Sequence, residues 1–104
     1  RFEGAPGTNP EELIAAAHAS CFSMALSMIL GQAGFAADHI STKATVSLDE
    51  VDGGFSVTKS HLEVTAQVPE ATEDDFDKAA QTAKDNCPIS KLLKAEITMD
   101  AALS

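Results

Sequence analysis

Hydrophobic and polar residues change their spacing at several points along the chain, which divides the sequence into helical and extended segments. Residues 13–37 contain no charged side chain. Asn9 before this stretch suits an N-cap, Pro10 suits the first helical turn, and Gly31 and Gly34 favour an ending. The pattern therefore predicts one long helix that begins at Pro10 and ends near Gly31.

Alternation between apolar and polar residues replaces this pattern over residues 38–68. The sequence Asp-Gly-Gly at residues 52–54 is typical of a tight turn, so we expect a β-hairpin with one buried face. The phase of the apolar positions changes between Val57 and Leu62, which requires a bulge or burial on both faces near Lys59. The positions expected to face the core are Ala44, Val46, Leu48, Leu62, Val64, Ala66 and Val68.

Helical spacing returns after Pro69, where Thr72 is a candidate N-cap and acidic residues crowd the first turn. Alternation then reappears near the end of the chain and predicts a third strand. The apolar residues expected to be buried in the second helix are Phe76, Ala79, Ala80 and Ala83, and those expected in the strand are Ile97, Met99 and Ala101.

The long apolar segment would also suffice to cross a membrane. It carries His18 and Gln32, however, both flanks are acidic, and no Lys, Arg, Trp or Tyr anchors either end. We therefore expect no membrane span. The helix is instead expected to be buried on nearly all sides, within a soluble domain or between two subunits.

Size and charge narrow the choice of partners. A chain of 104 residues supports one domain, and a core of that size gains from burial against a second copy. Sixteen acidic and seven basic residues give a net charge of −9, and no cluster of basic residues is present, so no nucleic-acid partner is expected.

Two cysteines without a disulfide framework fit a reducing compartment, which predicts a cytoplasmic location.

The two cysteines stand at contrasting positions. Cys21 lies inside the apolar helix, where a cysteine is usually an inert, buried residue. Cys87 precedes Pro88, which is expected to begin a short helix through Lys94, and unsatisfied N–H groups at such an end would stabilise a thiolate. Arg1 and an acidic pair at positions 11 and 12 add the charged context that reactive cysteines require.

The segments around both cysteines resemble the OsmC/Ohr family of thiol peroxidases over essentially all 104 residues. The segments that carry the resemblance are residues 1–4 (RFEG), 7–13 (GTNPEEL), 16–26 (AAHASCFSMAL) and 86–98 (NCPISKLLKAEIT). His18 and the run of residues 23–26 favour the OsmC branch over the Ohr branch.

The resemblance implies an α+β fold in which a long buried central helix lies against an antiparallel β-sheet, within an intertwined homodimer. Residues 1–104 are expected to form a single domain that lacks the family's amino-terminal strands, so the chain is expected to be a fragment. The implied activity is reduction of organic hydroperoxides to alcohols, which protects against oxidative and osmotic stress, with no cofactor and no metal. The implied reductant is a dithiol, with a lipoylated protein as one candidate.

Residue by residue, Cys21 matches the peroxidatic cysteine, Cys87 the resolving cysteine, Arg1 the catalytic arginine and Glu11 its partner glutamate. Cys21 would become a sulfenic acid and then form a disulfide with Cys87. Arg1 would lower the pKa of Cys21 and stabilise the leaving alkoxide. Cys21 follows Glu11 by ten residues, which is about 15 Å in a continuous helix. The long Arg1 side chain, a bend or a later start of the helix, or a second subunit must close that gap.

The histidines give weaker signals. His18 and Cys21 are three residues apart on one helix face, which makes a metal half-site or a catalytic dyad conceivable. Two ligands are too few for zinc, so His18 is expected to pack beside the cysteine or to act as a mild electrostatic neighbour. His39 and His61 are expected to be exposed.

Two alternatives remain open from the residues alone. Met24 and Met28 are expected to fill the core, or else to line the entrance for an apolar peroxide. A non-enzymatic dimeric domain, either structural or for binding a small ligand, competes with the peroxidase. In that domain both thiols would be inert.

Overall fold

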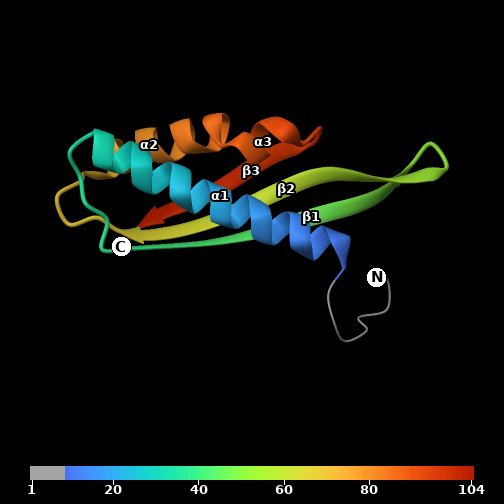
Figure 1. Ribbon diagram of the computed structural model, residues 1–104, viewed down its shortest axis with the longest axis horizontal. Coiled ribbons are helices and arrows are strands. Elements are labelled where there is room, and N and C mark those ends of the chain that lie inside the picture. Colours follow the sequence, from blue (N-terminus) through green and yellow to red (C-terminus); the bar gives the residue numbers. More distant parts are fainter. Residues whose placement is uncertain (1–8) are drawn as a thin grey trace.

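The computed structural model describes residues 9–104. The prediction for Arg1 therefore lies outside the described residues. Figure 1 shows α1 crossing in front of the strands, with α2 and α3 beside it. The elements are α1 (Pro10–Gln32), β1 (His39–Val51), β2 (Gly54–Gln67), α2 (Glu73–Asn86), α3 (Pro88–Leu92) and β3 (Glu96–Leu103).

Both ends of α1 follow the predicted signals. The Asn9 side chain accepts a hydrogen bond of 2.9 Å from the backbone N–H of Glu12, and Pro10 is the first helical residue. The helix ends at Gln32, and Gly34 adopts a φ of 92°, a conformation that glycine reaches without strain. The predicted helix is therefore confirmed at both termini.

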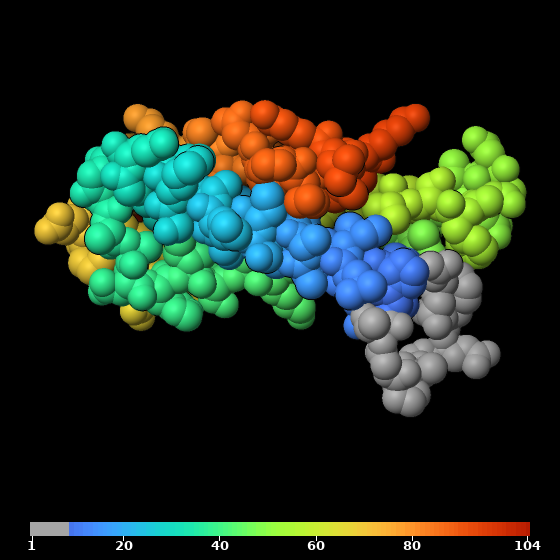
Figure 2. All heavy atoms as spheres, viewed as in Figure 1, coloured from blue at the N-terminus to red at the C-terminus, as the bar shows by residue number. Residues whose placement is uncertain are grey.

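Burial on α1 is confined to one stripe. His18, Phe22, Leu26 and Leu30 recur every four residues and are fully buried, as is typical of a helix packed on one side. The expectation of burial on nearly all sides is wrong for a single chain, because the sheet and the two later helices cover only this stripe. Figure 2 shows the outer surface of α1 running exposed across the molecule. By length and composition α1 would still qualify as a membrane-spanning helix.

The sheet is three-stranded, with the order β1-β2-β3. β1 and β2 form the predicted antiparallel hairpin, which turns through Asp52 and Gly53 at φ values of 52° and 82°. β3 pairs with β2 in parallel, so the sheet is mixed and not wholly antiparallel as expected. The reason lies in the connection: α2 and α3 carry the chain back across the sheet, and such a crossover permits parallel pairing.

The predicted change of phase in the second strand is a β-bulge. Ser47 pairs with Lys59, but the next residue, Leu48, pairs with Val57, so Thr58 is the extra residue. Apolar side chains after the bulge point to the core, and those before it do not. The buried apolar residues of this part of the chain are Leu62, Val64, Ala66 and Val68.

The two later helices complete the core. Thr72 and Asp75 form a reciprocal capping box at the start of α2, as its sequence predicted. α3 begins at Pro88 as expected but ends at Leu92, two residues before the predicted end, because Leu93 is already extended. The buried residues that α2 contributes are the four that were predicted, Phe76, Ala79, Ala80 and Ala83.

Candidate functional site

The sulfur atoms of Cys21 and Cys87 lie 3.0 Å apart, although 66 residues separate them in sequence. Cys21 lies in the middle of α1, and Cys87 is the residue between α2 and α3. Both cysteines are free, and the Cys87 thiol donates a hydrogen bond to the Cys21 sulfur. Since a disulfide bond is about 2.05 Å long, an approach of only about 1 Å would join them.

Only one of the two thiols has access to solvent. Cys87 is fully buried, whereas Cys21 is half-buried and lines a surface pocket of about 580 Å³. A reagent in this pocket therefore meets Cys21 first. The residues that line the pocket are mostly apolar: Ala17, Ser20, Cys21, Met24, Ala25, Met28, Pro88 and Ile89.

Met24 and Met28 of α1 are exposed residues that line this pocket. Met24 is 71 % exposed and Met28 is 60 % exposed, so neither fills the core of this chain. Both side chains line the pocket that holds Cys21. The expectation of core filling is therefore wrong, and the alternative placement near the cysteine agrees with the structure.

Opposing effects act on the Cys21 thiol. Burial raises its pKa above the ordinary value of 9.0, and the hydrogen bond with Cys87 raises the pKa further. A hydrogen bond from the backbone N–H of Ile89 lowers it. Among the described residues the balance favours the protonated thiol. The Arg1 guanidinium, which was expected to lower this pKa, lies outside them.

The amino-terminal end of α3 contacts Cys21. Cys87 is the N-cap residue, as predicted, but its side chain makes no capping hydrogen bond within the described part of the chain. Instead Ile89, in the first turn, directs its N–H toward the Cys21 sulfur. The N–H of this first turn therefore also serves Cys21, which the sequence did not indicate.

His18 lies in the protein interior behind the two thiols. Its Nδ1 atom is 2.6 Å from Ser60 Oγ, and its Nε2 atom is 2.8 Å from Ser90 Oγ. Burial lowers the pKa of His18 below its ordinary value of 6.5, so the ring is neutral near pH 7. His18 is a buried packing residue, as expected. Its two serine partners were not predicted.

The other two histidines, His39 and His61, differ in exposure. His39 is exposed, as predicted. His61 is wrongly predicted as exposed: its side chain is 28 % exposed, with Nδ1 2.6 Å from Thr98 Oγ1 and Nε2 3.2 Å from Asp100. Among residues 9–104, no three His, Cys, Asp or Glu side chains gather as a metal site would require.

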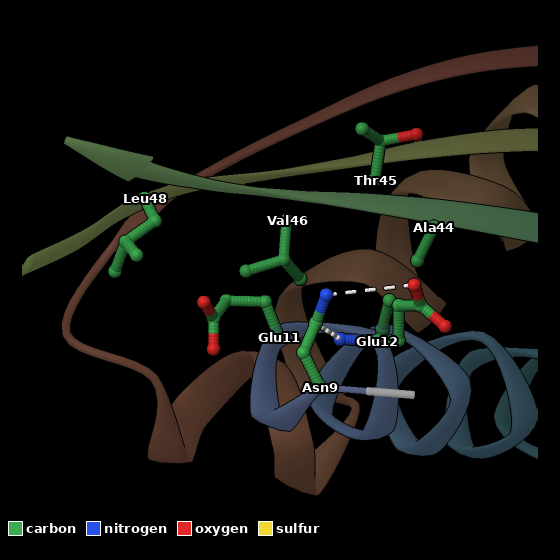
Figure 3. Close-up of a pocket in the computed structure, with 8 residues that line it drawn as sticks. Asn9, Glu11, Glu12, Ala44, Thr45, Val46 and Leu48 are labelled. Atoms are coloured by element: carbon green, nitrogen blue, oxygen red, sulfur yellow. Dashed lines mark hydrogen bonds between the residues drawn. The ribbon is translucent and has the colours of Figure 1, made fainter. Parts of the chain in front are cut away.

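Glu11 lies at the other end of the cysteine helix. It lines a second pocket, of about 450 Å³, between the start of α1 and β1. Figure 3 shows Glu11 and Asn9 on the helix opposite Val46 and Leu48 on the strand. Because α1 is continuous from Pro10, Glu11 stands about 15 Å from Cys21 along the helix axis. The structure thus removes the alternative of a late helix start and does not bring these two residues together.

Ser60 and Ser90 are the parts of this region that the sequence analysis missed. Ser90 belongs to the second cysteine segment, and Ser60 is a small polar residue that faces the core from β2. A buried histidine needs partners for both ring nitrogens. That requirement was a signal for nearby hydroxyl groups, but not for which ones.

Comparisons with known proteins match nearly the whole chain. The family model described as OsmC-like protein matches residues 3–102. The chain is 58 % identical to peroxiredoxin OsmC of Escherichia coli over 103 residues, which cover 99 % of this chain and 72 % of that protein. It is 32 % identical to organic hydroperoxide resistance protein-like 2 of Staphylococcus epidermidis over 97 residues, which cover 91 % of this chain and 66 % of that protein.

Solved structures agree with the fold. An OsmC-like protein from Mycoplasma pneumoniae superimposes with a TM-score of 0.83 at 16 % identity, covering 99 % of this chain and 77 % of that one. An organic hydroperoxide resistance protein from Elizabethkingia anophelis, crystallised with thiocyanate bound, gives a TM-score of 0.73 at 26 % identity. That match covers 95 % of this chain and 69 % of the other.

Proposed function

This chain belongs to the OsmC-like protein family, and on that premise we propose that it is a thiol peroxidase that reduces organic hydroperoxides to alcohols. The observation that carries the proposal is the pair of free thiols 3.0 Å apart, of which one opens on an apolar pocket. An alkyl hydroperoxide would bury its apolar part against Met24 and Met28 and present its O–O bond to Cys21. The activity protects the cell against oxidative and osmotic stress.

The exposure of the two thiols supports their roles. The Cys21 thiolate attacks the terminal peroxide oxygen, the O–O bond breaks, and the alkoxide leaves and takes up a proton as the alcohol. Cys21 is now a sulfenic acid. The buried Cys87 sulfur attacks the Cys21 sulfur, the S–O bond breaks, water leaves and a disulfide forms. A dithiol reductant, such as a lipoylated protein, then returns both thiols.

Arg1 is proposed as the cation that offsets the effect of burial on Cys21. Burial raises the pKa of this thiol, and the thiolate is the attacking species, so a neighbouring positive charge would raise the reactive fraction. The same guanidinium would stabilise the charge on the leaving oxygen. Glu11 would orient Arg1, either through the length of the Arg1 side chain or from a second subunit.

We propose a homodimer in the cytoplasm as the working form. Leu13, on the uncovered face of α1, is 61 % exposed, and Leu92 is 74 % exposed. A second copy would cover them and would also carry a second Glu11. Free thiols that must be reduced in each cycle suit a reducing compartment.

Intact mass after one equivalent of cumene hydroperoxide tests the proposal. We expect a loss of two hydrogens, with a non-reducing peptide map that joins Cys21 to Cys87. The Cys87→Ser variant is the matched control and should stop at the sulfenic acid or oxidise further. An unchanged wild-type mass would instead indicate a non-enzymatic domain with inert thiols.

A further inference from the structure

A buried polar bridge joins three elements directly behind the two thiols. His18 precedes Cys21 by three residues on α1, and Ser90 follows Cys87 by three residues on the other side. The ring of His18 spans from Ser90 on α3 to Ser60 on β2, at 2.8 and 2.6 Å. His18 and Ser60 have no exposed surface.

α3 depends on such an anchor. It has only five residues, none of them buried, and Leu92 is 74 % exposed. A helix of this length is not stable by itself. Within residues 9–104, the bond from Ser90 to His18 is the one hydrogen bond that a side chain of α3 (Pro88–Leu92) makes with another element, and the N–H of Ile89 adds a backbone contact to the Cys21 sulfur.

The same short helix supplies what the cysteine site needs. Cys87 immediately precedes it, and the N–H of Ile89 in its first turn points to the Cys21 sulfur. A shift of α3 away from α1 would therefore separate the two sulfurs and remove that N–H together. None of the three bridge residues lines the pocket that holds Cys21, so the bridge can restrain the turn without contacting a peroxide.

We propose that His18 is a positioning residue that, through Ser90, holds the first turn of α3 against Cys21. The inference rests on the proposed peroxidase function. The step it serves is condensation of the Cys21 sulfenic acid with Cys87, in which the S–S bond forms, the S–O bond breaks and water leaves. When α3 is displaced, the sulfenic acid persists. A second hydroperoxide then transfers an oxygen to it, which yields a sulfinic acid and a second alcohol.

Histidine suits this task because its two ring nitrogens face opposite ways. A neutral ring offers one donor and one acceptor, and a serine hydroxyl can complement either. Each nitrogen therefore has a partner, and the bridge adds no unsatisfied buried polar atom. Removing either serine hydroxyl leaves one ring nitrogen of His18 without its hydrogen-bond partner.

That symmetry provides a matched pair of variants. Ser90→Ala cuts the bridge at α3, whereas Ser60→Ala cuts it at the sheet and leaves Ser90 bonded to His18. Both leave one buried nitrogen without its partner, so a purely structural role predicts similar effects for both. Ser90→Thr keeps the hydroxyl and is the conservative rescue.

The measurement is rapid quenching of the reduced protein with cumene hydroperoxide, followed by mass spectrometry of disulfide and sulfinic acid at Cys21. We expect Ser90→Ala to close the disulfide about tenfold more slowly than wild type, equivalent to about 1.4 kcal/mol in the barrier. Its sulfinic fraction should rise with peroxide excess. Ser60→Ala and Ser90→Thr should close within about threefold of wild type, a difference of less than 1 kcal/mol.

Closure at the wild-type rate in Ser90→Ala would overturn the positioning role, as would equal slowing by both alanine variants or a Ser90→Thr variant as slow as Ser90→Ala. Failure of the proposed function is a different result, because then the wild-type protein itself forms no disulfide. Circular dichroism and thermal unfolding of each variant show that the comparison is made between folded proteins.

Discussion

At the scale of single residues, the reactivity of Cys21 depends on effects that oppose one another. Burial and the Cys87 thiol raise its pKa, while the N–H of Ile89 lowers it. A thiol whose pKa exceeds the ambient pH reacts only through its small thiolate fraction. The proposed role of Arg1 is to enlarge that fraction, and this role can be measured.

Replacing Arg1 with Gln should move the pH dependence of peroxide consumption to higher pH. Without the cation the pKa of Cys21 rises, and because this pKa lies above neutral pH, the thiolate fraction at pH 7 falls about tenfold for each pKa unit, or about 1.4 kcal/mol, of lost stabilisation. Raising the pH should restore part of the lost rate. Arg1→Lys keeps the charge and should retain the wild-type pH midpoint, although its different geometry lowers the rate. A pH midpoint unchanged in Arg1→Gln would count against the assignment.

His18 makes stability depend on pH. Its folded-state pKa lies below the ordinary value of 6.5 because of burial, so the unfolded chain binds more protons below pH 6.5. The free energy of unfolding should therefore fall as the pH decreases through 6.5, by at most about 1.4 kcal/mol from pH 7.5 to 5.5 on account of this residue.

Urea unfolding of wild type and His18→Asn at both pH values measures this contribution. The variant should be less stable at pH 7.5, because it loses the bridge between Ser60 and Ser90, but its stability should change less between the two values. Equal changes in both proteins would show that other groups produce the pH dependence.

At the scale of elements, local signals mark where helices and strands begin and end. Asn9 and Thr72 accept the first N–H groups of α1 and α2, and Asp75 returns the bond to the backbone of Thr72. Thr58 interrupts the hairpin ladder and brings the next apolar residues to the core face. These features depend on neighbours close in sequence, so their contributions can be tested one at a time.

Thr72→Ala should lower the free energy of unfolding by about 1 kcal/mol, because one N–H at the start of α2 loses its acceptor. Thr72→Ser keeps the hydroxyl and should remain within a few tenths of a kcal/mol of wild type. Urea unfolding at neutral pH compares the two. Peroxide consumption should persist in both variants, because the cap is remote from Cys21; equal stability of the two variants would contradict the capping role.

At the scale of the whole molecule, a single subunit leaves much of its longest helix uncovered. α1 buries one stripe against the sheet, while Leu13, Met24 and Met28 point outward. Figure 2 shows this outer surface as a continuous band across one face. The proposed homodimer would cover the part of the band around Leu13, leave the pocket at Cys21 open to a peroxide, and bring a second Glu11 within the assembly.

Leu13→Lys should convert the dimer to a monomer, because a charge would replace an apolar side chain that a second copy is proposed to cover. Light scattering coupled to size-exclusion chromatography measures the mass. Gln81→Lys makes the same charge change on exposed α2 and should leave the mass unchanged. A monomeric wild-type protein, or an unaltered mass in Leu13→Lys, would refute the dimer contact at this position.

Agreement between sequence and structure is closest where a feature depends on nearby residues. The N-cap at Asn9, the turn at Gly53, the bulge at Thr58 and the N-cap at Cys87 were all placed within a residue or two from local patterns. Such features need only backbone propensity and a few neighbouring side chains. The two cysteine segments also indicated the family, because their residues are specific over long runs.

Long-range packing decided the rest. β3 could have paired in either direction, and its parallel pairing follows from the path through α2 and α3. The contact of the two sulfurs at 3.0 Å and the bridge from His18 to Ser60 and Ser90 join residues that are 42 to 72 positions apart. The burial of Cys87 likewise results from such packing.

By itself, the sequence determined the elements, most of their ends and the presence of two separated thiols, because those depend on local chemistry. Only the tertiary structure decided which thiol faces the pocket, which one receives the N–H of Ile89 and what holds α3 in place. The physical reason is that accessibility and desolvation belong to a residue's surroundings, which the packing of distant segments creates.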